Sequence, residues 1–483
     1  MIWLLNPAVE SFFVSYLLRK EMGRIQRFLG GLVLLVSLAL FLMPPPAGVK
    51  TDMLRAGALV LLAVGFWATG VLPEFVTALL FILLSVLSSV APLPVIFSGF
   101  SSQALWLVFG GMILVGAVRR TGLGERIAGR LLDLLGGSYP RVIGGIVSLT
   151  LVAGFFMPST IGRVLLFVPI VSTMAEQLGF EREAPGRKGM ILAAILGCYI
   201  PSCSILPSNV PNMVLAGTAE SLYQITFSYS SYLKLHFPVT GVIKGLTIIP
   251  LICLLFPDRL RHAPAPRQKK KTPLNRQEGM LAVLLLVTLS LWATDFLHGI
   301  SPAWVALAAA LFCMLPWTKL LPAETFSREV SLSPFFYVAG VLGVGAIIAK
   351  TGLGDILGRE LLSRIDFKPG HTMQNFFLLT VVSIFIVMLV TSPGLPAVMV
   401  PLSADIATAT GFPLMTVLMT EVVAFSSPLL LYPVPPMIVG IQLGGLKASE
   451  TARATLVLGA LSVFVFLPIN YVWWSLLGVF GSS

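Results

Sequence analysis

A polar, proline-containing interruption inside an apolar stretch constrains the fold of this chain more than any other feature. Residues 155–169 read FFMPSTIGRVLLFVP, so a proline, Ser159, Thr160 and the charged Arg163 interrupt a hydrophobic run. Polar backbone is tolerated at membrane depth only where it is buried in protein or lines an aqueous cavity. Residues 390–401, VTSPGLPAVMVP, repeat the pattern in the second half of the chain. Paired interrupted segments at matching places in two halves are typical of secondary transporters.

The composition places the chain in a bilayer. Of its 483 residues, 56% are hydrophobic and 11% are charged, and the mean hydropathy is +0.93. A soluble domain carries roughly 25% charged residues. Long apolar runs recur along the chain, whereas the short alternating segments of a membrane barrel do not. We therefore predict an all-α polytopic protein of the cell (inner or plasma) membrane.

The same composition argues against other classes of protein. The net charge of +11 comes mostly from loops and span ends, where basic residues set topology, so nucleic-acid binding is not expected. The four cysteines form no CxxC pair and the four histidines are scattered, so no metal site and no cofactor are expected. An enzyme is not expected either, since no catalytic constellation is present.

The chain divides into four segments. Residues 1–53 comprise an interfacial helix and a first span, and the basic residues between them predict a cytoplasmic N-terminus. Residues 54–256 and 279–483 form two repeats, joined by a basic linker, residues 257–278, that is predicted to be cytoplasmic. The predicted spans are residues 28–43, 54–71, 74–91, 103–118, 237–256, 279–297, 302–317, 333–350 and 454–477.

The two repeats are predicted to insert in opposite directions. Thr121-Gly-Leu-Gly in the first repeat is echoed by Thr351-Gly-Leu-Gly in the second. Each repeat then contains an interrupted segment, predicted to be a re-entrant hairpin because its limbs are short for a crossing, and a helix broken by prolines. An odd number of spans separates equivalent positions, as in an inverted-topology repeat. We expect the two hairpin tips to approach each other and to face both broken helices.

The order of these motifs resembles the divalent anion/sodium symporter family, the carriers of dicarboxylates, citrate and sulfate within the ion transporter superfamily. The resemblance covers about residues 54–477. It implies an elevator-type motion of a hairpin-bearing domain against a dimeric scaffold, and hence a homodimer. The motifs that carry it are Leu72-Pro73-Glu74, GFSSQALWLVFGGMIL from Gly99, Thr121-Gly-Leu-Gly, and Ser208-Asn209-Val210-Pro211-Asn212 in place of the family's GTPPN loop.

The chain departs from the family pattern at the hairpin tips. The family carries a Ser-Asn-Thr triplet ten residues before a proline, and the equivalent triplets here are Ser159-Thr160-Ile161 and Thr391-Ser392-Pro393. In the family, these tips and the facing broken helices hold the substrate carboxylates and two sodium ions. Because both asparagines are absent, we expect a transporter that is not classically sodium-coupled.

Arg163 lies four residues after Ser159, about one helical turn from the first tip. A guanidinium at membrane depth is costly and usually functional. One interpretation is anion recognition, since the rigid fork of arginine matches carboxylate, sulfate or phosphate. In that place the guanidinium would also substitute electrostatically for a bound cation. The other interpretation is a structural pair with an acid on a neighbouring helix.

Glu421, within TVLMTEVVAF, is the best-placed intramembrane acid. It could couple protons to transport, because burial disfavours the charged form of a carboxyl group. It could equally pair with Arg163 across the interface between the repeats, or serve as a helix-capping or interfacial acid.

The remaining candidate ligands are neutral groups at the tips and in the broken helices. Backbone N–H groups at half-helix starts would assist them. The second broken helix offers only a tyrosine and carbonyl groups, so the site is expected to be asymmetric. The candidates are Ser159, Thr160, Ser208, Asn209, Asn212, Thr391, Ser392 and Tyr432.

These features predict a secondary transporter that carries a small anion by alternating access. The anion is expected to be a di- or tricarboxylate or an inorganic anion. Two alternatives are an anion channel with the same broken helices, and a sodium- or proton-coupled ion transporter of the same superfamily.

Overall fold

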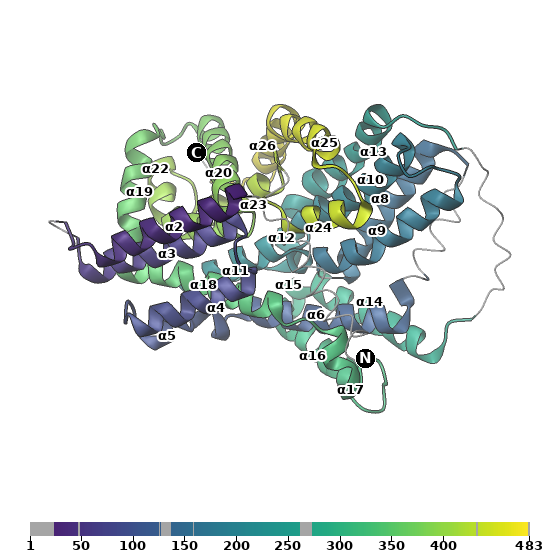
Figure 1. The fold of residues 1–483 in the computed structure, drawn as a ribbon, viewed down its shortest axis with the longest axis horizontal. Coiled ribbons are helices and arrows are strands. Elements are labelled where there is room, and N and C mark those ends of the chain that lie inside the picture. Colours follow the sequence, from purple (N-terminus) through teal and green to yellow (C-terminus); the bar gives the residue numbers. More distant parts are fainter. Residues whose placement is uncertain are drawn as a thin grey trace.

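The computed structural model describes residues 24–46, 49–124, 126, 137–157, 159–260, 273–430 and 433–481. Every regular element in these ranges is helical, which confirms the all-α prediction (Figure 1). The predicted interfacial helix at residues 1–18 lies outside the described residues, as do most of the basic linker and Tyr432. In Figure 1, α8, α9, α10 and α13 lie together at one end, α19, α20 and α22 lie at the other, and α11, α23 and α24 lie between.

The helices before the linker follow the predicted spans closely. Their bounds are α2 (Arg24–Leu42), α3 (Thr51–Thr69), α4 (Glu74–Leu87), α5 (Leu93–Ile96), α6 (Gln103–Thr121), α8 (Tyr139–Phe156), α9 (Thr160–Gln177), α10 (Pro185–Tyr199), α11 (Val210–Tyr223), α12 (Tyr229–His236) and α13 (Lys244–Leu255).

The helices after the linker repeat this order. The first of them begins inside the predicted linker, because Asn275 and Glu278 form a capping box at its start. The bounds are α14 (Arg276–Ala293), α15 (Asp295–His298), α16 (Pro302–Met314), α17 (Ala323–Glu329), α18 (Ser333–Thr351), α19 (Leu353–Arg364), α20 (Thr372–Val390), α21 (Gly394–Met399), α22 (Ser403–Thr410), α23 (Leu414–Phe425), α24 (Pro435–Gly444), α25 (Ala448–Leu461) and α26 (Leu467–Leu476).

Within the described ranges, eight helices are long and apolar enough to cross a membrane. The number is nine if Gly394–Thr410 and Leu414–Phe425, which meet at 118° across residues 411–413, form one broken span. The prediction of a polytopic membrane protein is thereby confirmed.

The two repeats interlock in a symmetric way. In the scaffold, α6 packs against α16, and the equivalent helix α18 packs against α4. Near the interrupted segments, α11 packs against α21 and α24 packs against α9. The two Thr-Gly-Leu-Gly motifs also share one local form, since Gly122 and Gly352 both end their helices with φ of 75°. The internal repeat predicted from the sequence is therefore present in the packing.

The limbs of the interrupted segments are longer than predicted. α8 and α9 each contain 18 residues, and α20 contains 19. Both α8 and α20 are long enough to cross a membrane, so the expectation of short limbs is wrong for the first limb of each segment. The glycines at 144 and 145 stay helical because the packing of α8 against α10 and α13 overrides their low helix propensity.

The last span of each repeat contains a π-helical turn. Tyr229–Leu255 includes a π-helix at Phe237–Ile243, and Glu450–Leu476 includes one at Ser462–Phe466. Such turns are rare and are frequent at functional sites. The first of them packs against the 3₁₀ turn at Pro201–Ser204, which follows α10.

We expect Gly110→Ala to destabilise the protein. A Cβ atom at Gly110 of α6 would lie 2.8 Å from the carbonyl carbon and 2.9 Å from the Cβ of Ala306 in α16. Backbone cannot yield as a flexible side chain does, so the overpacking should cost about 1–3 kcal/mol. The measurement is the melting temperature in detergent. The matched control is Gly31→Ala, where no atom lies within 4 Å of the added Cβ. Equal melting temperatures for the two variants would contradict this close crossing.

Candidate substrate and coupling site

We define four segments by their residues. The first tip is residues 157–161 and the first break is residues 200–209. The second tip is residues 391–393 and the second break is residues 426–434. Each tip separates the two limbs of an interrupted segment, and each break separates two half-helices: α10 from α11, and α23 from α24.

The first tip starts a helix with its own hydroxyl. Ser159 has extended backbone, and its Oγ accepts a hydrogen bond of 3.1 Å from the Gly162 N–H. This is the ordinary role of a serine N-cap. Ser159 therefore positions the start of α9, and its neighbour Thr160 is turned toward the first break.

Arg163 joins three chain segments at this tip. Its side chain is 0% exposed. The guanidinium donates to the Met157 carbonyl at the end of α8, to the Cys198 carbonyl in the last turn of α10 at 3.0 Å, and to the Ser208 carbonyl in the first break at 3.2 Å. It also donates to Thr160 Oγ1 at 3.2 Å. Arg163 thus binds the first tip to the first break.

The partners of Arg163 are neutral oxygens. None of the ion pairs found among the described residues includes Arg163. The predicted alternative of a pair with Glu421 or another acid is therefore wrong. Carbonyls at helix ends carry partial negative charge and take the place of the acid. Both terminal nitrogens of the guanidinium are engaged by protein, so in this conformation the fork does not face an open site.

The first break is held by the side-chain amides of Asn209 and of Asn212, which lies in the first turn of α11. Asn212 Nδ2 donates to the carbonyls of Ser202 at 3.1 Å and Ile205 at 2.9 Å. Asn209 Nδ2 lies 3.2 Å from Cys203 Sγ. Within the described part of the chain, Asn212 Oδ1 and Ser208 Oγ are buried and have no hydrogen-bond partner. Buried polar atoms are normally satisfied, so these two oxygens are candidate ligands for a substrate or a cation.

The second tip has strained backbone. Thr391 follows α20 with φ of 87° and ψ of 159°, a conformation that β-branched residues rarely adopt. Such strain clusters at functional sites. The next residue, Ser392, donates its N–H to the Pro433 carbonyl at 2.8 Å, which ties the second tip to the second break.

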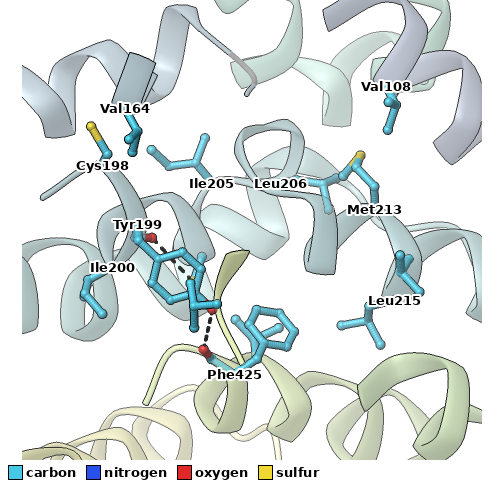
Figure 2. Packing of buried hydrophobic residues seen from close by; sticks show 14 of the residues in the cluster. Val108, Val164, Cys198, Tyr199, Ile200, Ile205, Leu206, Met213, Leu215 and Phe425 are labelled. Carbon is cyan, nitrogen blue, oxygen red and sulfur yellow. Dashed lines mark hydrogen bonds between the residues drawn. The ribbon is translucent and has the colours of Figure 1, made fainter. Parts of the chain in front are cut away.

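Tyr199 connects the two halves of the site. Its hydroxyl donates to the Phe425 carbonyl, at the end of α23, at 2.7 Å (Figure 2). The same hydroxyl lies 3.1 Å from Ser392 Oγ at the second tip. Toward the first tip, Ser202 Oγ donates to the Tyr199 carbonyl at 2.6 Å and lies 3.3 Å from Thr160 Oγ1. The first tip therefore contacts the first break, and the second tip contacts the second break and the end of α10. The predicted approach of the two tips to each other stays a prediction. The side chains at this junction are all buried, so the site is occluded. They belong to Tyr199, Ser392, Ser202 and Thr160.

A family model described as "Sodium:sulfate symporter transmembrane region" matches residues 27–480. The chain belongs to this family. The Staphylococcus saprophyticus protein named sodium-dependent dicarboxylate transporter SdcS is 22% identical over 475 residues, which cover 92% of this chain and 90% of that protein. A Cupriavidus necator protein named "Membrane protein" is 22% identical over 296 residues, so the chain spans 58% of that relative.

A solved structure supports the fold. The crystal structure of the Alcanivorax borkumensis YdaH transporter superposes with a TM-score of 0.55 and 12% sequence identity, covering 90% of this chain and 100% of that one. Identity this low shows the fold alone. Together with the sodium:sulfate symporter family match, it makes the protein a multi-pass membrane transporter and not an enzyme.

Glu421 lies on α23 of this transporter fold and is 2% exposed. Neither carboxyl oxygen has a hydrogen-bond partner among the described residues. An ionised carboxylate in such surroundings carries a large desolvation cost. The helix-capping alternative is therefore wrong, because the side chain is buried within α23 and caps nothing.

Two buried basic residues of the site are not predicted from the sequence. Lys244, 2% exposed, follows the first π-helix and contacts the start of the second break. His236, 0% exposed, places Nε2 3.3 Å from Met419 Sδ on α23. The sequence signal for Lys244 is the same as for Arg163, a lone charge inside an apolar run. It is less conspicuous because no adjacent pair of hydroxyl residues, such as Ser159 and Thr160, lies near it.

Proposed function

We propose that this protein is a secondary transporter of a small anion that does not depend on sodium. The anion is a di- or tricarboxylate or an inorganic anion such as sulfate. The similarity to a protein named for dicarboxylate transport and the family's description by sulfate both favour this class. The observation that carries the proposal is the buried guanidinium of Arg163 among carbonyl oxygens of the first tip and first break.

Those carbonyls are ligands that also suit a sodium ion. In transporters of this architecture, unwound carbonyls and half-helix C-termini coordinate the coupling cation. Here a covalently attached cation takes these oxygens permanently, since Arg163 is fully buried and cannot leave. Positive charge beside the substrate is then present in every step of the cycle, so an ion gradient is not needed to supply it.

The anion itself would lie where two helices begin. α9 starts at the first tip and α11 starts after the first break, and Thr160 Oγ1 lies 3.2 Å from the Ser208 carbonyl between them. Helix N-termini favour anions through their free N–H groups and the helix dipole. The unpartnered Ser208 hydroxyl supplies a further donor. At the second tip, Thr391 and Ser392 provide the matching hydroxyls.

Transport would proceed by alternating access with an elevator-type motion, in a homodimer of the cell membrane with its N-terminus in the cytoplasm. The occluded arrangement of the tips supports a moving domain, because substrate cannot reach buried groups without displacement. A channel would need a continuous open path, so the occlusion favours a transporter over this alternative.

We expect anion uptake to continue when sodium is replaced by choline. Purified protein in liposomes should accumulate labelled succinate, citrate or sulfate at the same rate in both salts, because Arg163 supplies the cation. Protein-free liposomes are the control. Saturation of uptake and its acceleration by the same anion on the opposite side would exclude a channel. Uptake that stops in choline would show classical sodium coupling and refute the proposal.

A further inference from the structure

Lys244 lies at the carbonyl end of the half-helix α23. Its Nζ donates to the Ser426 carbonyl and to Ser427 Oγ at 3.0 Å, and lies 3.4 Å from Ser426 Oγ. Ser426 is the C-cap residue of α23 and begins the second break. A cation there interacts favourably with the negative end of the helix dipole.

The ammonium of Lys244 has no acidic partner among the described residues. None of the ion pairs found there includes it. Its surroundings are one carbonyl, two hydroxyls and the ring of Phe466, whose centroid is 6.0 Å away. Oxygen ligands at a half-helix C-terminus are those that hold a coupling cation in transporters with broken helices.

The second tip lacks a cation of its own. Arg163 lies six residues before Pro169, and the residue six before Pro401 is the apolar Leu395. At the first break, Arg163 binds a carbonyl in the last turn of α10. At the second break, the end of the equivalent half-helix α23 is bound by Lys244 instead. The two breaks therefore each hold one buried cation, supplied from different elements.

Two π-helical turns lie next to Lys244. The π-helix at Phe237–Ile243 immediately precedes Lys244, and Phe466 is the last residue of the second π-helix. Both irregular turns thus meet at the ammonium group. A π-turn inserts one residue into a helix and changes the direction of the side chains after it, which explains how a lysine from α13 reaches the second break.

We propose that Lys244 is a second built-in cation, whose ammonium occupies the place of a coupling ion at the carbonyl end of α23. The role of Lys244 in transport rests on the proposed sodium-independent function. Its test uses protein stability instead, so the two can fail separately.

The experiment measures melting temperatures of purified variants in sodium chloride and in choline chloride. Lys244→Ala leaves the oxygens of Ser426 and Ser427 without their cation, beside a space that a sodium ion could occupy. We therefore expect a lower melting temperature than wild type in choline, and a higher melting temperature of this variant in sodium than in choline. Lys244→Met fills the space without charge and should be destabilised equally in both salts. Wild type and Lys234→Ala, a control at an exposed position on α12, should not respond to the change of salt.

Three results would overturn the inference. The first is a Lys244→Ala variant whose melting temperature is the same in both salts. The second is stabilisation of the wild type by sodium that is as large as that of Lys244→Ala, which would show that Lys244 does not occupy the cation position. The third is failure of both Lys244→Ala and the charge-retaining Lys244→Arg to fold in either salt, which would show a packing role. Uptake by the wild type that stops in choline would refute the proposed function only, provided that Lys244→Ala still gains its response to sodium.

Discussion

Replacing Arg163 with glutamine is expected to stop transport and to lower the melting temperature of the ligand-free protein. The variant loses donors to the carbonyls of Met157, Cys198 and Ser208 and leaves them buried. Hydrogen bonds to charged groups contribute about 1.5–3 kcal/mol each. A total loss of about 3 kcal/mol or more corresponds to a hundredfold or larger change in the population of the assembled site. Anion uptake and thermal unfolding should both be measured.

Two further arginine variants make this test specific. Arg163→Lys keeps the charge but lacks the planar fork, so it should recover only part of both properties. Arg187→Gln is the matched control, since Arg187 is also a buried arginine but its bonds to carbonyls are 3.4 and 3.5 Å long. It should have a much smaller effect. If Arg163→Gln abolished anion binding without changing the ligand-free melting temperature, Arg163 would contact the substrate and would not hold the tip to the break.

Glu421→Gln is expected to abolish the response of anion uptake to a proton gradient. The carboxyl group is buried without a hydrogen-bond partner among the described residues, so it is stable there only as the neutral acid. When the site opens to water, the acid can release its proton, and an amide cannot. Wild-type uptake should therefore increase with an inward proton gradient, whereas uptake by the variant should be the same with and without it.

The control for this variant is Asp405→Asn, which neutralises an exposed acid on the neighbouring helix α22. It should leave the gradient response intact. Folding of Glu421→Gln should be preserved, because one neutral group of similar size replaces another. If the wild type does not respond to the gradient, or the glutamine variant still responds, Glu421 does not carry the coupling proton and exchange becomes the favoured mode.

The sequence predicted the parts of the site that interrupt apolar segments. Prolines, hydroxyls and Arg163 are conspicuous there, because a bilayer tolerates polar backbone only inside protein. The partners of these groups could not be predicted. Arg163 and Lys244 both bind main-chain carbonyls, which every residue possesses and which therefore leave no mark in the sequence. The bond between Tyr199 and Ser392 joins positions 193 residues apart and depends on how the two repeats pack.

The length of the hairpin limbs was predicted wrongly for a different reason. The sequence around the glycines at 144 and 145 indicates a weak helix, but burial against α10 and α13 outweighs the cost of individual glycines. The strained backbone of Thr391 is likewise imposed by its surroundings, since threonine itself disfavours a positive φ.

The π-turn before Lys244 acts as a rotational offset within one long span. Upstream of the turn, the helix directs Tyr232 to the first break, where its hydroxyl donates to the Cys203 carbonyl at 2.8 Å. Downstream, Lys244 faces the second break. In a regular helix each residue advances about 100° around the axis. Removing one residue from Phe237–Ile243 would therefore rotate every later side chain by that angle and turn the ammonium away from α23. A single span can thus contact two different breaks only because the π-turn rotates the side chains of its second part relative to those of its first.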